Sequence, residues 1–153
     1  MKLTIPYFKQ ERNTTCGVAS VRMVLAFHGK TISESELADV CDTSWLGNTP
    51  GELVVGIDKL GFNATEIEGI TIEYLSQALQ DADPIIALID PAVLYGGIEG
   101  FGHYVVIIGI ENDNIIFHDP DMDSDQVRAS FDFFKSWRGF SMKGIRIWKS
   151  MKK

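Results

Sequence analysis

Apolar residues recur at helical spacing near the start of the chain. Between Thr15 and His28 they fall three or four positions apart, from Val18 to Leu25, which predicts a helix with one apolar face. A threonine just before this stretch is typical of a helix start, and Gly29 just after it is typical of a helix end. We therefore expect the first element to be a helix that is capped by one of the two adjacent threonines.

Three more helices are expected before the middle of the chain. Each opens with a serine or threonine placed to cap it, and in the first two a glutamate follows three positions later, as in a capping box. The expected helices begin at Ser33, Thr49 and Thr71 and run through Val40, Leu60 and Leu79. A short extended segment near residues 62–67 separates the last two.

The pattern changes to short apolar runs after Pro84. Runs of this length, rich in isoleucine and valine and bounded by turn residues, are typical of strands. They cover Ile85–Ile89, His103–Ile110, Ile115–His118 and Gly144–Trp148. Asn112–Asn114 predicts a turn that joins the second and third runs into an antiparallel hairpin. A last helix is expected at Phe131–Trp137, before the closing strand.

Helices followed by antiparallel strands predict an α+β protein, in which the N-terminal helices pack on a C-terminal antiparallel β-sheet. The chain has 153 residues, of which 45% are hydrophobic, and it shows no internal repeat or linker. Residues 1–153 are therefore expected to form one domain. Residues 91–102 contain four glycines and are expected to form a mobile loop.

Charge and hydropathy exclude several classes of protein. The chain carries 14 Lys and Arg against 21 Asp and Glu, a net charge of -7 without a basic stripe, which argues against a nucleic-acid partner. The longest apolar runs have the length of strands, so no transmembrane segment is expected. The first residues lack the features of a secretory signal, which predicts a cytoplasmic protein.

The two cysteines are expected to be isolated thiols, as in a reducing compartment. Cys16 falls at the start of the first predicted helix, where the helix dipole favours a thiolate, the nucleophilic form of the side chain. Gly17 leaves space beside that sulfur and leaves the first helical amides free to bind an oxyanion. A buried structural cysteine is the alternative that this position alone leaves open.

A general base for Cys16 has to come from one of three histidines. His28 lies at the far end of the same helix, which excludes it because the distance along the helix axis is on the order of 18 Å. His103 opens a strand whose hairpin partner ends near Asp119, so a carboxylate is expected to orient its ring. His118 is a rival base, although it has the opposite strand parity to that acid.

Four sequence motifs together resemble one known family. Gln10 closes an extended stretch, and an amide there is placed to help hold a tetrahedral oxyanion. The motifs are Ile5-Pro6-Tyr7-Phe8-Lys9-Gln10, Cys16-Gly17-Val18-Ala19-Ser20, Gly102-His103-Tyr104-Val105-Val106 and His118-Asp119-Pro120. The chain is similar over nearly its whole length to the bacteriocin-processing, or double-glycine leader, peptidases, which are papain-like cysteine proteases.

The resemblance implies a papain-like fold and a role for each matching residue. It makes Cys16 the nucleophile, His103 the base, Asp119 the residue that orients the base, and Gln10 part of the oxyanion hole. The family's best-known members precede ABC transporters, whereas this chain is similar to the free-standing branch, with a separately encoded transporter as the implied partner. Thr15 stands where transporter-linked members usually have an aspartate, a departure that leaves the catalytic set intact but argues against the double-glycine specificity.

The function predicted from these observations is hydrolysis of a peptide or protein substrate by a cysteine peptidase that uses a Cys-His-Asp triad and processes leader peptides. Two alternatives stay open at this point. The same thioester also serves acyl or amide transfer, and the same fold without catalysis would serve as a peptide-binding module. The loop before His103, residues 91–102, is expected to border the cleft and control substrate entry.

No metal or organic cofactor is expected. Aspartates at the first, third, fifth and twelfth places of a twelve-residue segment, Asp121 to Asp132, match part of a calcium-binding loop. The glycine required at its sixth place is replaced by Gln126, and no helix clearly enters the segment. A solvated acidic loop is therefore the preferred interpretation.

Overall fold

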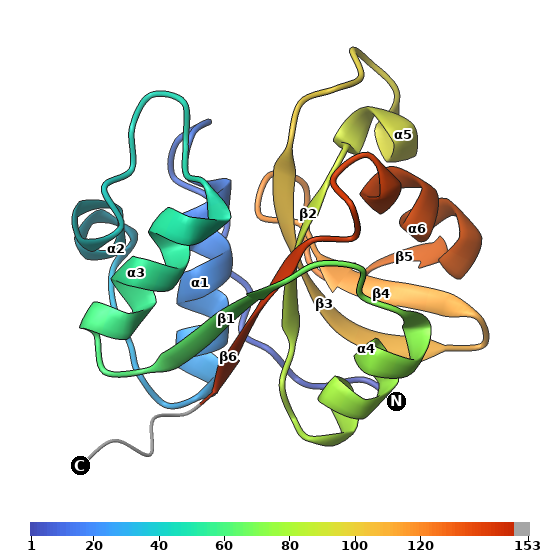
Figure 1. The fold of residues 1–153 in the computed structure, drawn as a ribbon, viewed down its shortest axis with the longest axis horizontal. Coiled ribbons are helices and arrows are strands. Elements are labelled where there is room, and N and C mark those ends of the chain that lie inside the picture. The colour runs from blue at the N-terminus through green and yellow to red at the C-terminus, as the bar shows by residue number, and fades with distance from the viewer. Residues whose placement is uncertain (149–153) are drawn as a thin grey trace.

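The computed structural model describes residues 1–148 and has the predicted α+β fold (Figure 1). The helices are α1 (Cys16–Phe27), α2 (Glu34–Val40), α3 (Pro50–Lys59), α4 (Ile72–Gln80), α5 (Pro91–Tyr95) and α6 (Ser130–Arg138). The strands are β1 (Asn63–Ile67), β2 (Ile85–Ile89), β3 (His103–Glu111), β4 (Asn114–His118), β5 (Gln126–Ala129) and β6 (Gly144–Trp148). Every helix and strand expected from the sequence is present.

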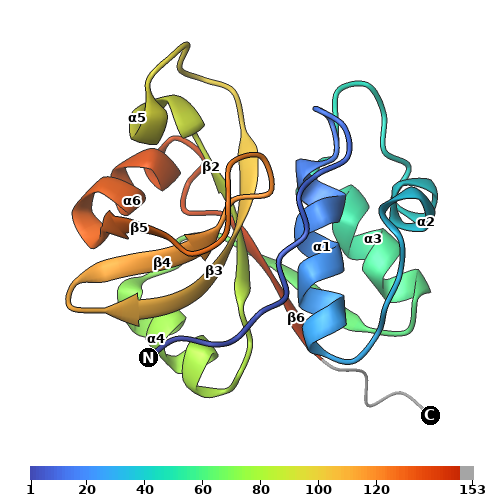
Figure 2. The same ribbon diagram turned by 180° about the vertical axis from the view of Figure 1, so that it is seen from behind.

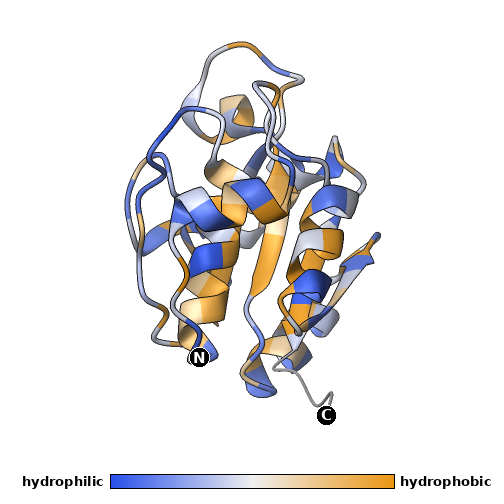
Figure 3. Cartoon of the chain, turned by 90° about the vertical axis from the view of Figure 1, so that its left-hand side faces the viewer, coloured by the Kyte–Doolittle hydropathy of each residue, from blue (hydrophilic) through white to orange (hydrophobic). Residues whose placement is uncertain are grey.

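The six strands form one antiparallel sheet in the order β1-β6-β2-β3-β4-β5. Helices α1–α3 cover one face, as expected, whereas α4 and α6 cover the other face (Figures 1 and 2). Alternate residues of each central strand enter different cores: Ile86 and Val106 pack with α1–α3, while Ile85 and Ile107 pack toward α4 and α6. Figure 3 shows the apolar central strands between the helices. The sheet is therefore buried on both faces.

Capping residues set several helix boundaries. The Thr49 hydroxyl accepts the Glu52 N–H while the Glu52 carboxylate accepts the Thr49 N–H, so the predicted capping box of α3 is confirmed. The Thr71 side chain likewise caps α4. Thr15 occupies the cap position of α1 but makes no capping hydrogen bond, because its hydroxyl bonds Arg12 instead. The prediction of a side-chain cap on α1 was therefore wrong.

The predicted β3–β4 hairpin is confirmed. Asn112 and Asp113 have φ values of 52° and 63°, the left-handed conformations that a tight hairpin turn requires, and β3 pairs with β4 from Glu111 and Asn114 onward. Two short elements were not predicted. Helix α5 lies within the glycine-rich segment 91–102, and β5 adds an edge strand to the sheet.

The first residues start near α4, pass the central strands and then rise beside α1 (Figure 2). The Leu3 N–H donates to Ile108 O, and the Gln10 N–H donates to Pro120 O, both at 2.8 Å. This path brings the N-terminal segment past the end of β4 before it turns into α1.

Within residues 1–148, none of the helices combines the length and the apolar character that crossing a bilayer requires.

Candidate active site

Cys16 is the first residue of α1 and lies next to the start of β3. Its side chain is partly exposed, and it lines a cleft of about 460 Å³ with Gly102 and Tyr104. A Cβ atom at Gly17 would lie 3.2 Å from Leu53 and Tyr104, so the glycine permits the close approach of α1 to β3. The packing of α1 on β3 therefore holds the thiol at the edge of an open cleft.

His103 faces both Cys16 and Asp119. Its Nε2 lies 2.7 Å from Asp119 Oδ1, and the Cys16 side chain is near enough to the ring to raise its pKa. Because Nε2 is committed to the carboxylate, Nδ1 is the ring nitrogen that remains for a thiol. The side chains of His103 and Asp119 are 13% and 1% exposed, so the pair is largely shielded from solvent. The structure thus brings a thiol, an imidazole and a carboxylate together.

His103 and Asp119 each shift the pKa of the other toward its charged form. Burial acts to lower the pKa of His103, but hydrogen bonds with Asp119 and Cys16 and the negative charges of both raise it to about 10. Burial acts to raise the pKa of Asp119, and the hydrogen bond and positive charge of His103 outweigh burial and hold it below its ordinary value. At neutral pH the pair is therefore an imidazolium beside a carboxylate.

This charge pair predicts a stability contribution that is lost at both ends of the pH range. The His103 part is complete below its unfolded pKa of 6.5 and disappears as pH rises toward about 10, because the folded pKa is the higher one. The Asp119 part is complete above about 3.9 and disappears as pH falls, because its folded pKa is the lower one. Melting temperatures of wild type and His103→Gln between pH 3 and 10 should differ most near pH 5–6. A difference that does not vary with pH would contradict the ion pair.

Two tyrosines that sequence reasoning missed also contact Asp119. The Tyr95 hydroxyl donates to Asp119 Oδ2 at 2.8 Å, and the Tyr7 hydroxyl donates to the Asp119 backbone oxygen at 2.6 Å. The Asp121 N–H donates to Oδ1 at 2.9 Å. Tyr7 belongs to the motif that ends at Gln10. No sequence spacing connects Tyr95 with the aspartate, so only the fold shows that contact.

Gln10 lies in the segment that leads to Cys16. Its Nε2 donates to Arg12 O at 2.8 Å, and its buried Oε1 has no hydrogen-bond partner among the residues that the structure describes. An amide nitrogen carries two hydrogens, so the bond to Arg12 O fixes the amide and leaves the second hydrogen for another acceptor. That free hydrogen is the one that an oxyanion hole would use.

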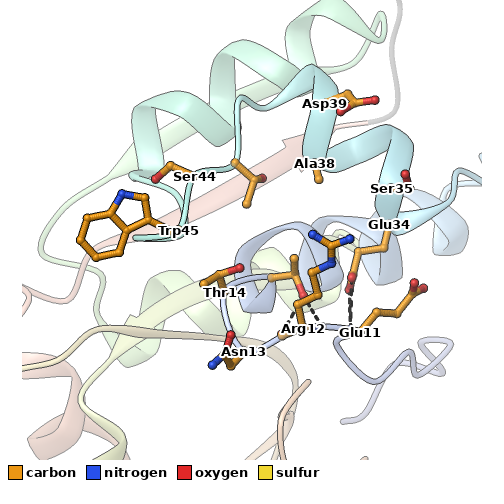
Figure 4. Close-up of a pocket in the computed structure, with 12 residues that line it drawn as sticks. Glu11, Arg12, Asn13, Thr14, Glu34, Ser35, Ala38, Asp39, Ser44 and Trp45 are labelled. Atoms are coloured by element: carbon orange, nitrogen blue, oxygen red, sulfur yellow. Dashed lines mark hydrogen bonds between the residues drawn. The ribbon is translucent and has the colours of Figure 1, made fainter.

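A buried glutamate, also missed by sequence reasoning, anchors the same segment. Glu34, the first residue of α2, is 3% exposed, and both of its carboxylate oxygens accept the Glu11 N–H, at 3.0 and 3.1 Å (Figure 4). The Thr15 hydroxyl accepts the Arg12 N–H and donates to Arg12 O. Burial raises the pKa of Glu34, although the hydrogen bond from the Glu11 N–H acts in the opposite direction. Helix α2 thus holds the turn between Gln10 and Cys16.

Removing this anchor should affect turnover more than substrate binding. We expect Glu34→Ala to leave the Glu11 N–H unpaired, to cost about 1–3 kcal/mol of stability and to lower kcat by roughly tenfold with little change in KM. Glu34→Gln keeps an acceptor oxygen and should recover most of both losses. Thermal melts and steady-state kinetics measure the two effects, and an Ala variant as stable and as active as wild type would exclude the anchoring role.

The other two histidines have structural contacts. His118, the rival base, is 2% exposed, its Nε2 bonds Ile5 O, and its Nδ1 accepts the Asp125 N–H. Both ring nitrogens are therefore occupied away from Cys16. His28 ends α1, as expected, and its Nε2 bonds Ile147 O.

The aspartates of the acidic segment do not converge. Within residues 1–148, no group of three or more His, Cys, Asp or Glu side chains is placed to hold a metal ion. Asp125 pairs with Lys2, and Asp132 lies in α6 rather than in the preceding loop.

A second groove, of about 600 Å³, continues from the cleft at Cys16. Figure 4 shows its lining of polar residues from the turn before α1 and from α2, with Trp45 at one end. Asn13, Thr14 and Trp45 line both hollows. The two hollows therefore adjoin each other, and an extended chain that lies at Cys16 would have room to continue into the second groove.

The arrangement of helix, sheet and thiol defines a papain-like cysteine peptidase fold. Residues 2–152 match the model of the Peptidase_C39 like family, and the chain belongs to this family of cysteine peptidases.

Curated relatives include larger transport proteins. The chain is 27% identical over 139 residues to the mesentericin-Y105 transport/processing ATP-binding protein MesD of Leuconostoc mesenteroides, a match that covers 90% of the chain and 18% of MesD. It is 28% identical to the sublancin-168-processing and transport ATP-binding protein SunT of Bacillus subtilis, over 86% of the chain and 18% of SunT. The chain spans less than a fifth of the length of these relatives.

Solved structures share the fold. A putative C39-like peptidase from Bacillus anthracis superposes with a TM-score of 0.81 at 20% identity, over 97% of this chain and 96% of that one. The peptidase domain of Streptococcus ComA, a bi-functional ABC transporter, has a TM-score of 0.73 at 24% identity, over 92% and 95%. A double glycine motif protease from an AMS/PCAT transporter, solved with its leader peptide, has a TM-score of 0.73 at 20% identity, over 95% and 92%.

Proposed function

We propose that the chain hydrolyses peptide bonds through Cys16, His103 and Asp119, with Gln10 in the oxyanion hole. The observation that carries this proposal is the 2.7 Å contact between His103 Nε2 and Asp119 Oδ1, which directs the other ring nitrogen to the thiol at the start of α1. An oriented imidazole beside a thiol is the arrangement that thiol acyl transfer requires.

The reaction proceeds in two steps. The Cys16 thiolate attacks the peptide carbonyl carbon, and the resulting oxyanion accepts the free Gln10 N–H and a backbone N–H at the start of α1. The His103 imidazolium gives its proton to the departing amine, and a thioester to Cys16 remains. Water then attacks the thioester while His103 takes up a proton, which releases the carboxylic acid and restores the thiolate.

The proposed substrates are leader peptides of secreted peptides. Support comes from the relatives that are named for processing and transport, and from the peptidase solved with its leader peptide. Residues 1–153 would act as one cytoplasmic peptidase domain that works together with a transporter. Thr15 lines the second groove but is 3% exposed, and its hydroxyl is engaged with Arg12, so we place substrate choice in the more exposed groove residues.

Digestion of a peptide library, read by mass spectrometry, tests this function. We expect cleavage by wild type and none by Cys16→Ala, with a preference for two consecutive glycines before the cut. Cleavage without that preference would exclude leader processing but keep the peptidase. New acyl-amine products in place of free acids would identify a transferase, and retained peptides without any product would identify a binding module.

A further inference from the structure

Tyr95 connects the segment between β2 and β3 to the candidate triad. Asp119 Oδ1 has two donors, His103 Nε2 and the Asp121 N–H, whereas the Tyr95 hydroxyl is the donor to Oδ2. The Asp119 side chain is 1% exposed. Within residues 1–148, no other protein group donates to Oδ2, so this oxygen depends on Tyr95.

Asp90 fixes the segment that carries Tyr95. Its Oδ1 accepts the Ala92 N–H and opens α5, and its Oδ2 accepts the Gly100 N–H at 2.8 Å beyond the helix. Asp90 is itself 8% exposed. One buried carboxylate therefore ties the two ends of the segment 91–100, and α5 presents Tyr95 to Asp119. The Arg128 guanidinium of β5 lies 5.2 Å from the centre of the Tyr95 ring.

A buried carboxylate oxygen without a donor disfavours the ionised acid. With Tyr95 in place, both oxygens of Asp119 are satisfied, and the carboxylate cannot turn about its Cβ–Cγ bond without breaking three hydrogen bonds. Its negative charge is thereby kept beside His103 Nε2.

We propose that Tyr95 is a positioning residue for the triad, whose hydroxyl keeps Asp119 ionised and turned toward His103. This inference rests on the proposed peptidase function. The segment 91–100 leads into the cleft through Gly102. In this proposal the segment does more than border the cleft, because through Tyr95 it also positions Asp119 against His103.

The sign of the effect follows from the groups around Asp119. These are His103 of β3 with Cys16 beyond it, Tyr95 of α5, Tyr7 of the N-terminal segment, Asp121 and Asp123 of the following loop, and Arg128 of β5. Loss of the Tyr95 hydroxyl should raise the pKa of Asp119, because its ionised form loses a donor. The weakened carboxylate should then stabilise the imidazolium less, so the pKa of His103 should fall.

Tyr95→Phe tests the proposal, with Tyr7→Phe as the matched control. Tyr7 loses the same hydroxyl from the same residue, but its partner is the backbone oxygen of Asp119 and not the carboxylate. The rate of Cys16 alkylation by iodoacetamide is measured from pH 4 to 11, along with kcat/KM for a cleaved library peptide. Alkylation needs no turnover, so it reports on the triad even in an inactive variant.

For Tyr95→Phe we expect the rise of both the alkylation rate and kcat/KM with pH to move to higher pH. We expect the fall of kcat/KM at high pH to move to lower pH, because the imidazolium is the acid that protonates the leaving amine, so the pH range of kcat/KM narrows by about one pH unit in total. We also expect kcat/KM at pH 7 to fall roughly tenfold. Tyr7→Phe should keep the pH range of the wild-type protein. If Tyr95→Phe does not fold, Asp90→Asn, which loosens the segment without touching Asp119, should show the same narrowing. If folded Tyr95→Phe has the same pH range as wild type, the inference is overturned.

The two proposals fail in different ways. If wild type cleaves no peptide, the peptidase function fails, while the alkylation profiles still decide the role of Tyr95. If wild type cleaves peptides and Tyr95→Phe keeps the wild-type profile, only the role of Tyr95 is excluded.

Discussion

Cys16→Ala is expected to lower kcat/KM for peptide cleavage by about 10⁵-fold or more, the largest effect of any single substitution in the chain. In our proposal the thioester forms on this sulfur, and among residues 1–148 the cleft offers no second cysteine. Rapid labelling by iodoacetamide at neutral pH should disappear in the same variant.

Cys41 is the internal control for that labelling. It is 1% exposed, and burial raises its pKa to about 11, so it should stay unmodified in the folded protein under the same conditions. Labelling is assigned by the mass of the peptide that contains each cysteine. A Cys16→Ala variant that cleaves peptides at the wild-type rate would exclude Cys16 as the nucleophile.

His103→Ala is expected to have the second-largest effect, a loss of about 10³–10⁴-fold in kcat/KM. The variant lacks both the cation beside the thiolate and the acid that protonates the leaving amine. Cys16 alkylation at pH 5–6 should slow as well, since the positive charge of the imidazolium beside the sulfur is lost. Stopped assays over pH 4–10 measure both effects.

Two variants serve as comparisons for His103→Ala. His28→Ala removes a histidine that lies at the other end of α1 and should retain the wild-type kcat/KM. Asp119→Asn keeps an acceptor for His103 Nε2 but lacks the charge, so its loss should be smaller than that of His103→Ala. Equal activity in His103→Ala and wild type would exclude His103 from the reaction.

Local patterns predicted most of the fold because each element carries its own signal. Thr49 and Glu52 bond each other three residues apart, and Asn112 and Asp113 tolerate the left-handed turn, so neither feature depends on the rest of the chain. The second helical layer was missed because α4 and α6 meet the sheet through contacts between distant segments. Strand β5 is four residues long and lacks an apolar run.

At the candidate site, too, local signals predicted some contacts, whereas contacts between distant segments were missed. His103 and Asp119 follow from one hairpin and one motif, so the sequence alone indicated that they would meet, and the structure confirms the contact. Tyr95 lies 24 residues from Asp119, and Glu34 lies 23 residues from Glu11, and neither pair has a sequence pattern. These contacts depend on the path of the chain between elements, which only tertiary packing determines. The catalytic roles themselves stay a prediction until they are measured.

The most direct test is the mass of wild-type protein that is acid-quenched during the first turnover of a cleaved peptide. Our account predicts that the tryptic peptide Asn13–Arg22 gains the mass of the acyl fragment on the N-terminal side of the cut, because Cys16 is its only cysteine. Appearance of cleavage products while this peptide stays unmodified, or an adduct on another residue, would contradict the account.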